Sequence, residues 1–135
     1  MTLVQLGSDA KVNVREIDAQ HEHLIALLNR LHDTMMRQED TDTLGRVLSE
    51  LIDYTQTHFR YEEQLMSEYD YSRYASHKAA HEKLMQHIVS LAEGFRSGEV
   101  LLSFAIMVDL KGWAITHIEQ CDKPLGAFLN TRKVF

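Results

Sequence analysis

Two histidines lie on the apolar face of the stretch SHKAAHEKLMQHIVSL, residues 76–91, when it is read at helical spacing. Positions 77, 81, 84, 88 and 91 share one helical face, and they hold His, His, Leu, Ile and Leu. Burying two imidazoles one turn apart costs free energy unless both rings have partners. The spacing of His77 and His81 therefore indicates a binding role.

Three further histidines and one glutamate occupy inward positions of other predicted helices: His21, His58, Glu62 and His117. Neutral imidazole nitrogen and carboxylate oxygen, without thiolate, suit Fe, Zn, Ni, Cu or Mn. Five histidines exceed the needs of one tetrahedral ion, and the count fits two ions that share bridging carboxylates. A lone inward histidine is more often a hydrogen-bonded core residue, and Glu62 has the alternative role of a structural partner for a histidine. Five histidines at one height favour the metal site.

The elements that position these residues are four segments with helical periodicity, interrupted by few glycines and one proline. They cover residues 18–38 (with Asp18 as N-cap), 42–68, 73–96 and 100–121. Short connections make neighbouring helices antiparallel, which predicts an all-α, up-down-up-down four-helix bundle and brings the six residues to one end of it. We expect one domain over 1–135, with an N-terminal arm (1–17) and an irregular or weakly helical tail (123–135) after the bundle (18–122).

Length and composition are those of a soluble single domain of 135 residues with 44% hydrophobic residues. The net charge of -6 and the absence of a basic cluster argue against nucleic acid or an anionic membrane as partner. The N-terminus lacks a signal-peptide pattern, and the longest apolar run, VLLSFAIMV, is about half as long as a membrane span. With the single Cys121, these features predict a cytoplasmic protein.

Four segments resemble, in order and spacing, the motifs of the hemerythrin family in its bacterial branch, the bacteriohemerythrins. They are DAQHEHL around His21, HFRYEE from His58, HKAAH from His77, and WAITHIEQCD from Trp113. The resemblance extends over about residues 12 to 129, and each motif lies on a predicted inward face. Myohemerythrin is itself a known four-helix bundle, so the resemblance implies the same fold as the periodicity.

The resemblance implies a centre of two non-heme iron ions joined by an oxo or hydroxo bridge. It assigns three histidines to one iron, two to the other and two carboxylates as bridges: His77, His81 and His117; His21 and His58; Glu62 and Asp122. The second iron then has an open position, where dioxygen binds reversibly.

Asp122 is a ligand only by this resemblance. Residues five apart on an α-helix differ by about 140°, so periodicity places Asp122 away from His117. Pro124 disfavours helical geometry at Lys123, which predicts that the backbone is leaving the regular helix where Asp122 turns inward.

The resemblance also assigns an oxygen pocket, lined by Trp113, Ala114, Ile118 and Phe59. Where the family motif commonly reads Trp-Leu-x-x-His-Ile, this chain reads WAITHI, with Ala114 in place of a leucine that lines the pocket. The smaller side chain predicts more space beside the open iron position, unless a neighbour fills it.

Three other histidines, His23, His32 and His87, lie off the inward stripes or at another height, and we expect them to be surface or flanking residues. The leading functional hypothesis is reversible dioxygen binding for cytoplasmic storage, delivery or scavenging. Alternatives are a sensing domain for oxygen or nitric oxide, and a di-iron enzyme with peroxidase-like or nitric oxide reducing activity. Ferritin-like di-iron oxidases use repeated Glu-x-x-His, which is absent from this sequence. Binding of dioxygen or small anions is therefore expected rather than enzyme activity, and the sequence indicates no redox partner.

Overall fold

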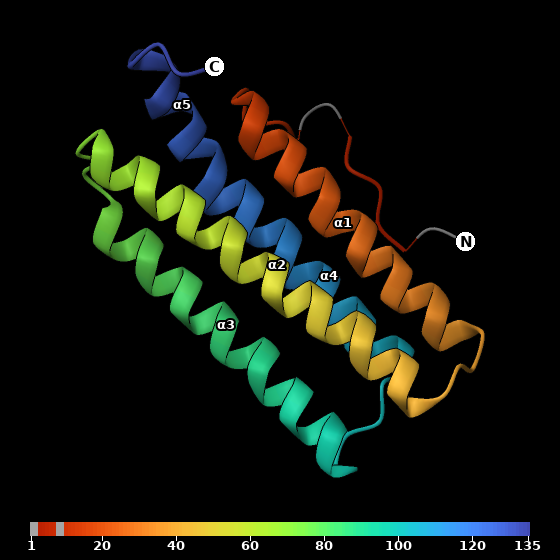
Figure 1. The fold of residues 1–135 in the computed structure, drawn as a ribbon. Helices are drawn as coiled ribbons and strands as arrows, with labels where there is room; N and C mark the ends of the chain where they lie inside the picture. Colours follow the sequence, from red (N-terminus) through yellow and green to blue (C-terminus); the bar gives the residue numbers. More distant parts are fainter. Residues whose placement is uncertain (1–2, 8–9) are drawn as a thin grey trace.

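The computed structural model describes residues 3–7 and 10–135, and helices are the only regular elements within them. They are α1 (Arg15–Met36), α2 (Thr41–Glu68), α3 (Tyr74–Ser97), α4 (Phe104–His117), the π-helical turn η2 (Ile118–Asp122) and α5 (Lys123–Thr131). The last three follow one another directly and form one rod (Figure 1). None of the described helices is long and apolar enough to cross a membrane.

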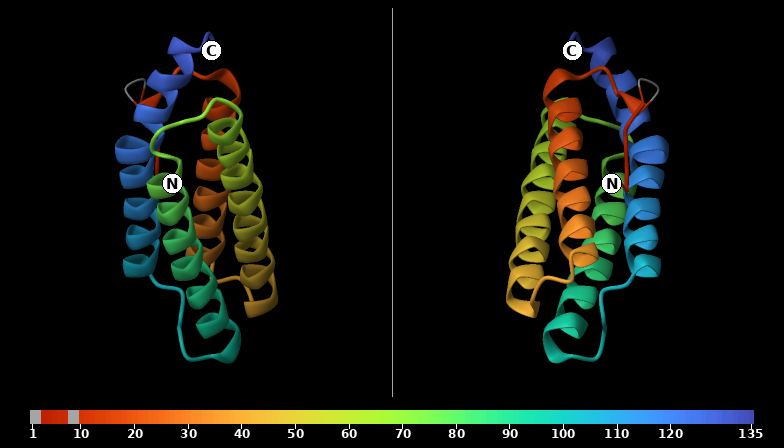
Figure 2. Two further views of the ribbon diagram at one scale, coloured as in Figure 1. Left: turned by 90° about the vertical axis from the view of Figure 1, so that its left-hand side faces the viewer. Right: turned by 90° about the vertical axis from the view of Figure 1, so that its right-hand side faces the viewer.

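The helices α1, α2 and α3 and the α4–η2–α5 rod lie side by side and alternate in direction, as both views in Figure 2 show. Helix α2 packs against both α1 and α3, and the α4–η2–α5 rod completes the bundle. The prediction of an all-α, antiparallel four-helix bundle is confirmed. The connections are short because the helix ends carry strong stop and start signals. Asp40 accepts a hydrogen bond from the Thr43 amide at 2.8 Å to start α2, and Gly98, with φ 81°, ends α3.

Helix α1 begins three residues before the predicted N-cap, Asp18. Its N-cap residue is Val14, which makes no side-chain capping bond. The Asp18 carboxylate lies in the first turn, where the positive end of the helix dipole stabilises its negative charge. It also accepts hydrogen bonds from the backbone amides of Val12, at 2.8 Å, and Asn13, at 3.1 Å. Asp18 therefore ties the arm to the helix instead of starting it.

The segment after Pro124 is a regular helix, so the prediction of an irregular or weakly helical tail is wrong. Proline lies in the first turn of α5, where its fixed φ suits helical geometry. Leu125 and Leu129 are fully buried and hold α5 against the bundle. Gly126 allows the arm to cross closely, because a Cβ at this position would overlap the Val12 carbonyl oxygen.

Two apolar clusters occupy the interior, and the predicted site residues lie between them along the chain. The cluster at the α5 end is formed by buried residues that include Ile17, Met66 and Leu125; the larger one fills the rest of the bundle with residues such as Ile25, Leu51 and Leu110. On each of three rods, buried polar residues separate a member of one cluster from a member of the other. The bundle thus places a polar layer between two apolar cores, and apolar packing on both sides fixes its position.

Candidate metal centre

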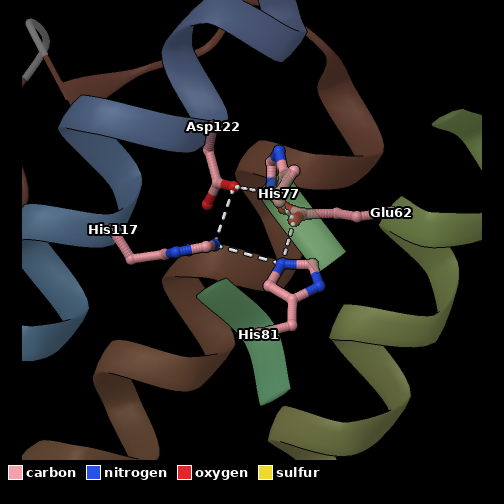
Figure 3. Close-up of side chains that lie close together, drawn as sticks. All are labelled: Glu62, His77, His81, His117 and Asp122. Atoms are coloured by element: carbon pink, nitrogen blue, oxygen red, sulfur yellow. Dashed lines mark hydrogen bonds and ion pairs between the residues drawn. The ribbon is translucent and has the colours of Figure 1, made fainter. Parts of the chain in front are cut away.

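All seven predicted ligands come together in this polar layer, and none is more than 7% exposed. Figure 3 shows Glu62, His77, His81, His117 and Asp122 converging from α2, α3 and the α4–η2 rod. His21 reaches the same place from α1, and His58 lies one turn before Glu62 on α2. Each rod contributes ligands because the inward-facing stripe of its side chains passes through the polar layer.

Two groups of ligand atoms form in this layer, and they share both carboxylates. Within each group, one nitrogen or oxygen from every member lies within 4.8 Å of the others. The first group is Glu62, His77, His81, His117 and Asp122; the second is His21, His58, Glu62 and Asp122.

Each oxygen of Glu62 serves a different group. Its Oε1 lies 3.0 Å from Nε2 of His81 and 3.2 Å from Nε2 of His77. Its Oε2 lies 3.0 Å from Nε2 of His58 and 3.6 Å from Nε2 of His21. Glu62 therefore offers one oxygen to each group.

Asp122 divides its oxygens in the same way. Its Oδ1 lies 3.1 Å from Nε2 of His77 and 3.1 Å from Nε2 of His117, both in the first group. Its Oδ2 lies 2.9 Å from Nε2 of His21, in the second group. The two carboxylates thus face each other across the centre with one oxygen on each side.

The donor atoms fit metal ions better than they fit one another. Within the described chain, Nε2 of His21, Nε2 of His58, Oε2 of Glu62 and both oxygens of Asp122 are buried without a hydrogen-bond partner. Such groups are costly to bury unless something pairs with them. Nitrogen and carboxylate oxygen at this density are the ligand types of Fe, Zn, Ni, Cu or Mn.

The contact between the rings of His81 and His117 also brings two ring nitrogens together. Nε2 of His81 lies 3.1 Å from Nε2 of His117, while Nδ1 of His81 lies 2.8 Å from a Glu63 oxygen. Because Nδ1–H donates to that carboxylate, Nε2 of a neutral His81 presents a lone pair to the second ring. Either an N–H of His117 or a metal ion between the two rings can satisfy this lone pair.

Protons take that role in the metal-free protein. Burial lowers the pKa of His21 and His77, but the adjacent carboxylates of Asp122 and Glu62 outweigh it and raise both to about 9. Burial likewise opposes the Asp122 charge at His117, whose pKa rises to about 10. Burial raises the pKa of Asp122, yet His117 and His21 bring it down to about 2. Metal ions therefore displace protons when they bind, since imidazole coordinates only as the neutral ring.

The comparison with known families agrees with this geometry. The sequence model of the hemerythrin HHE cation binding domain matches residues 12–129. The chain belongs to the hemerythrin family.

The family relationship holds for individual relatives and for solved structures. A bacteriohemerythrin of Methylococcus capsulatus is 34% identical over 118 residues, covering 87% of this chain and 89% of the relative. One of Stenotrophomonas maltophilia is 32% identical over 123 residues, covering 91% and 79%. The crystal structure of a wild-type hemerythrin superposes with a TM-score of 0.87 at 31% identity, covering 93% of this chain and 97% of that one. The predicted resemblance to hemerythrin is confirmed.

Asp122 reaches the hemerythrin site by a route that differs from the predicted one. Lys123 keeps helical geometry, with φ -61° and ψ -47°, so the backbone does not leave the helix there. The turn before it is widened instead, and the Lys123 amide donates to the Ile118 carbonyl five residues earlier. A π turn places residues five apart nearly one above the other, which brings Asp122 to the face of His117.

The four residues assigned to the oxygen pocket, Trp113, Ala114, Ile118 and Phe59, all line one cavity of about 70 Å³. The site histidines His21, His58 and His117 line it too, and leucines and isoleucines of all four rods close it toward the middle of the bundle. Phe59 stacks flat on His81, with ring centres 3.8 Å apart and planes 6° from parallel.

Sequence analysis missed two polar residues next to the centre and misplaced one histidine. Gln20 and Glu63 contact the outer ring nitrogens of His58 and His81; the only signal was their position beside a predicted ligand. His23 and His87 are exposed as predicted. His32 is buried, 6.1 Å from the Phe104 ring near the opposite end of the bundle, so its expected surface position is wrong.

Proposed function

We propose that the protein binds dioxygen reversibly at a pair of non-heme irons, for oxygen storage, delivery or scavenging in the cytoplasm. The observation that carries this proposal is the division of each carboxylate between two groups: Glu62 and Asp122 each give one oxygen to either side. Membership of the hemerythrin family supports iron as the metal.

The residues would hold the two irons unequally. His77, His81 and His117 supply three nitrogens to one position, and His21 and His58 supply two to the other. The position with fewer protein ligands is left with room for an external molecule. Ferrous ions held by these histidines and by Glu62 and Asp122 would supply the redox chemistry of reversible dioxygen binding.

The surrounding side chains favour a small apolar guest. Phe59 and Ile118 are buried beside the histidines, and the cavity along Trp113 and Ala114 is mainly apolar. An apolar cavity of this kind tends to stay dry, while dioxygen enters without losing hydrogen bonds. Exclusion of water also limits proton delivery to bound dioxygen, which keeps the binding reversible.

The balance of ligands supports binding over oxidation chemistry. Five neutral histidines and two carboxylates give the centre less negative charge than a carboxylate-rich oxidase site, and negative charge stabilises high-valent iron. We therefore propose a binding protein without a dedicated enzymatic reaction.

An absorption spectrum through a full oxygenation cycle tests the proposal. Protein loaded with ferrous iron under anaerobic conditions should be nearly colourless, develop visible bands in air, and lose them under argon. Bands that appear and persist after dioxygen is removed would show irreversible oxidation and refute reversible binding.

A further inference from the structure

Two histidines of the centre donate their outer ring nitrogens to chemically different acceptors. Nδ1 of His81 lies 2.8 Å from Oε2 of Glu63, a carboxylate. Nδ1 of His58 lies 2.7 Å from Oε1 of Gln20, a neutral amide. The two bonds have nearly the same length, so the difference between them is charge.

The neutral acceptor is held in place by its own partner. Nε2 of Gln20 donates to Oε1 of Glu16 at 3.2 Å, one turn earlier on α1. This bond fixes which end of the amide is which, because the NH2 group must face Glu16 and the oxygen must face His58. His58 is thus kept as a ring that donates from Nδ1 and offers Nε2 to the centre.

His21, the other histidine of the two-histidine group, has no charged acceptor at its outer ring nitrogen. Nδ1 of His21 is buried and has no hydrogen-bond partner in the described chain. Apart from the shared Glu62 and Asp122, the three-histidine group therefore has an acidic contact, the Glu63 carboxylate, that has no counterpart in the two-histidine group within the described residues. Its side chain is 22% exposed, so solvent screens the charge in part, but a direct charge-assisted bond is stronger than a neutral one.

We propose that Glu63 is a positioning residue that strengthens metal binding at the three-histidine position, and that the Gln20 amide keeps the two-histidine position the weaker one. A histidine that donates to a carboxylate gives more electron density through its opposite nitrogen than one that donates to an amide. This inference rests on the part of the proposed function that places metal in both positions.

Two variants separate charge from hydrogen bonding. Glu63→Gln keeps the side-chain length and an acceptor oxygen for His81 but removes the charge. The reverse change, Gln20→Glu, would face the Glu16 carboxylate one turn away, so it is combined with Glu16→Gln. This double variant gives His58 a charged acceptor and keeps a possible amide donor at position 16.

The measurement is the affinity of both iron sites, from competition between ferrous-loaded protein and a chelator under anaerobic conditions. Loss of an outer partner typically lowers metal affinity about 10- to 100-fold, and loss of its charge alone should approach the lower figure. We expect Glu63→Gln to bind its tighter iron about tenfold more weakly, and the double variant to bind its weaker iron more tightly. The reduction potential should rise in the first variant and fall in the second, while thermal unfolding of the metal-free proteins changes little.

Opposite shifts in the two variants support the inference. Unchanged iron affinities and reduction potentials in Glu63→Gln overturn the inference. Shifts of the same sign in both variants also overturn it, because a merely structural role would weaken iron binding in both variants alike. Wild-type protein that takes up no iron overturns this inference together with the proposed function. Wild-type protein that holds two irons but does not release dioxygen overturns the proposed function and leaves the inference standing.

Discussion

Replacing Ala114 by leucine should fill the cavity beside the centre and change both stability and ligand access. The cavity measures about 70 Å³, and Ala114 lies in its wall together with Trp113 and Ile118. At about 24 cal/mol per Å³, complete filling stabilises the fold by at most about 1.7 kcal/mol. Overpacking opposes this gain when the added atoms exceed the space, and it costs about 1–3 kcal/mol.

The thermal shift follows from the size of the chain. An unfolding entropy of about 2.1 cal/mol/K per residue makes about 1.7 kcal/mol equal to a rise of about 6 °C in Tm. We expect metal-free Ala114→Leu to melt higher than the wild type, by no more than this amount. Ala105→Leu is the matched control, because Ala105 is exposed on the same helix and a leucine there fills no cavity. Its Tm should stay close to that of the wild type.

Ligand access should change in the opposite sense. A leucine in the cavity wall leaves less room for water and small anions near His21 and His58, which line the same cavity. Iron-loaded Ala114→Leu should therefore bind azide more weakly and keep its oxygenated absorption bands longer in air than the wild type. A lower Tm together with unchanged azide affinity and band lifetime would refute the reasoning, since the cavity would then be neither fillable nor a path to the centre.

Four further predictions concern the metal and its ligands. Metal analysis after anaerobic loading should give two irons per chain, and one zinc without iron would contradict the shared-carboxylate site. His58→Ala and His77→Ala should lose iron on gel filtration, whereas exposed His23→Ala should keep it; equal losses would show that the inward faces are misassigned. Because the folded pKa values of His21, His77 and His117 are raised to about 9, 9 and 10, they stabilise the metal-free fold fully below about pH 6.5. Urea unfolding should show stability falling between about pH 7 and 10, and a flat profile would refute this. Iron loading has the reverse dependence and should fall in acid, as the ligands take up protons.

Most of the candidate site follows from periodicity because the fold is simple. A histidine on an inward stripe has one direction available, and antiparallel helices with short connections fix its height. His58 and Glu62, four residues apart, therefore had to share one place in the core.

The hydrogen bonds of Gln20 and Glu63 to the ligand histidines could not be predicted from periodicity. Gln20 and Glu63 each adjoin a ligand in sequence, and neighbours on a helix point about 100° apart. Whether such a residue bonds the outer ring nitrogen depends on the tilt of the ring and on the facing helix, which the stripe pattern does not contain. The bonds from Gln20 to His58 and from Glu63 to His81 both join different helices.

The position of His32 was predicted wrongly. His32 follows the buried Leu28 by four residues and the buried Ile25 by seven, so helical spacing already places it on the buried face of α1. The arm runs along this helix, and the Val4 backbone makes two hydrogen bonds of 2.8 Å with the Asn29 side chain, one turn before His32. Phe104 covers the ring from the start of α4. The arm and the start of α4 thus add cover at this end of a face that helical spacing already buries.

Asp122 required a local change in the helix itself. Pro124 was the correct signal, but its consequence is different from the one expected. A proline has no N–H to offer the carbonyl four residues earlier, so the regular ladder is already interrupted at this point. The chain uses the interruption to pass from α-helical to π-helical bonding over Ile118–Asp122, with the Lys123 amide bonded to the Ile118 carbonyl, and then resumes an α-helix. The widened turn brings Asp122 under His117, where its two oxygens face both groups of ligands. An unbroken α-helix would point the same carboxylate about 140° away and leave the centre with Glu62 as its one bridge.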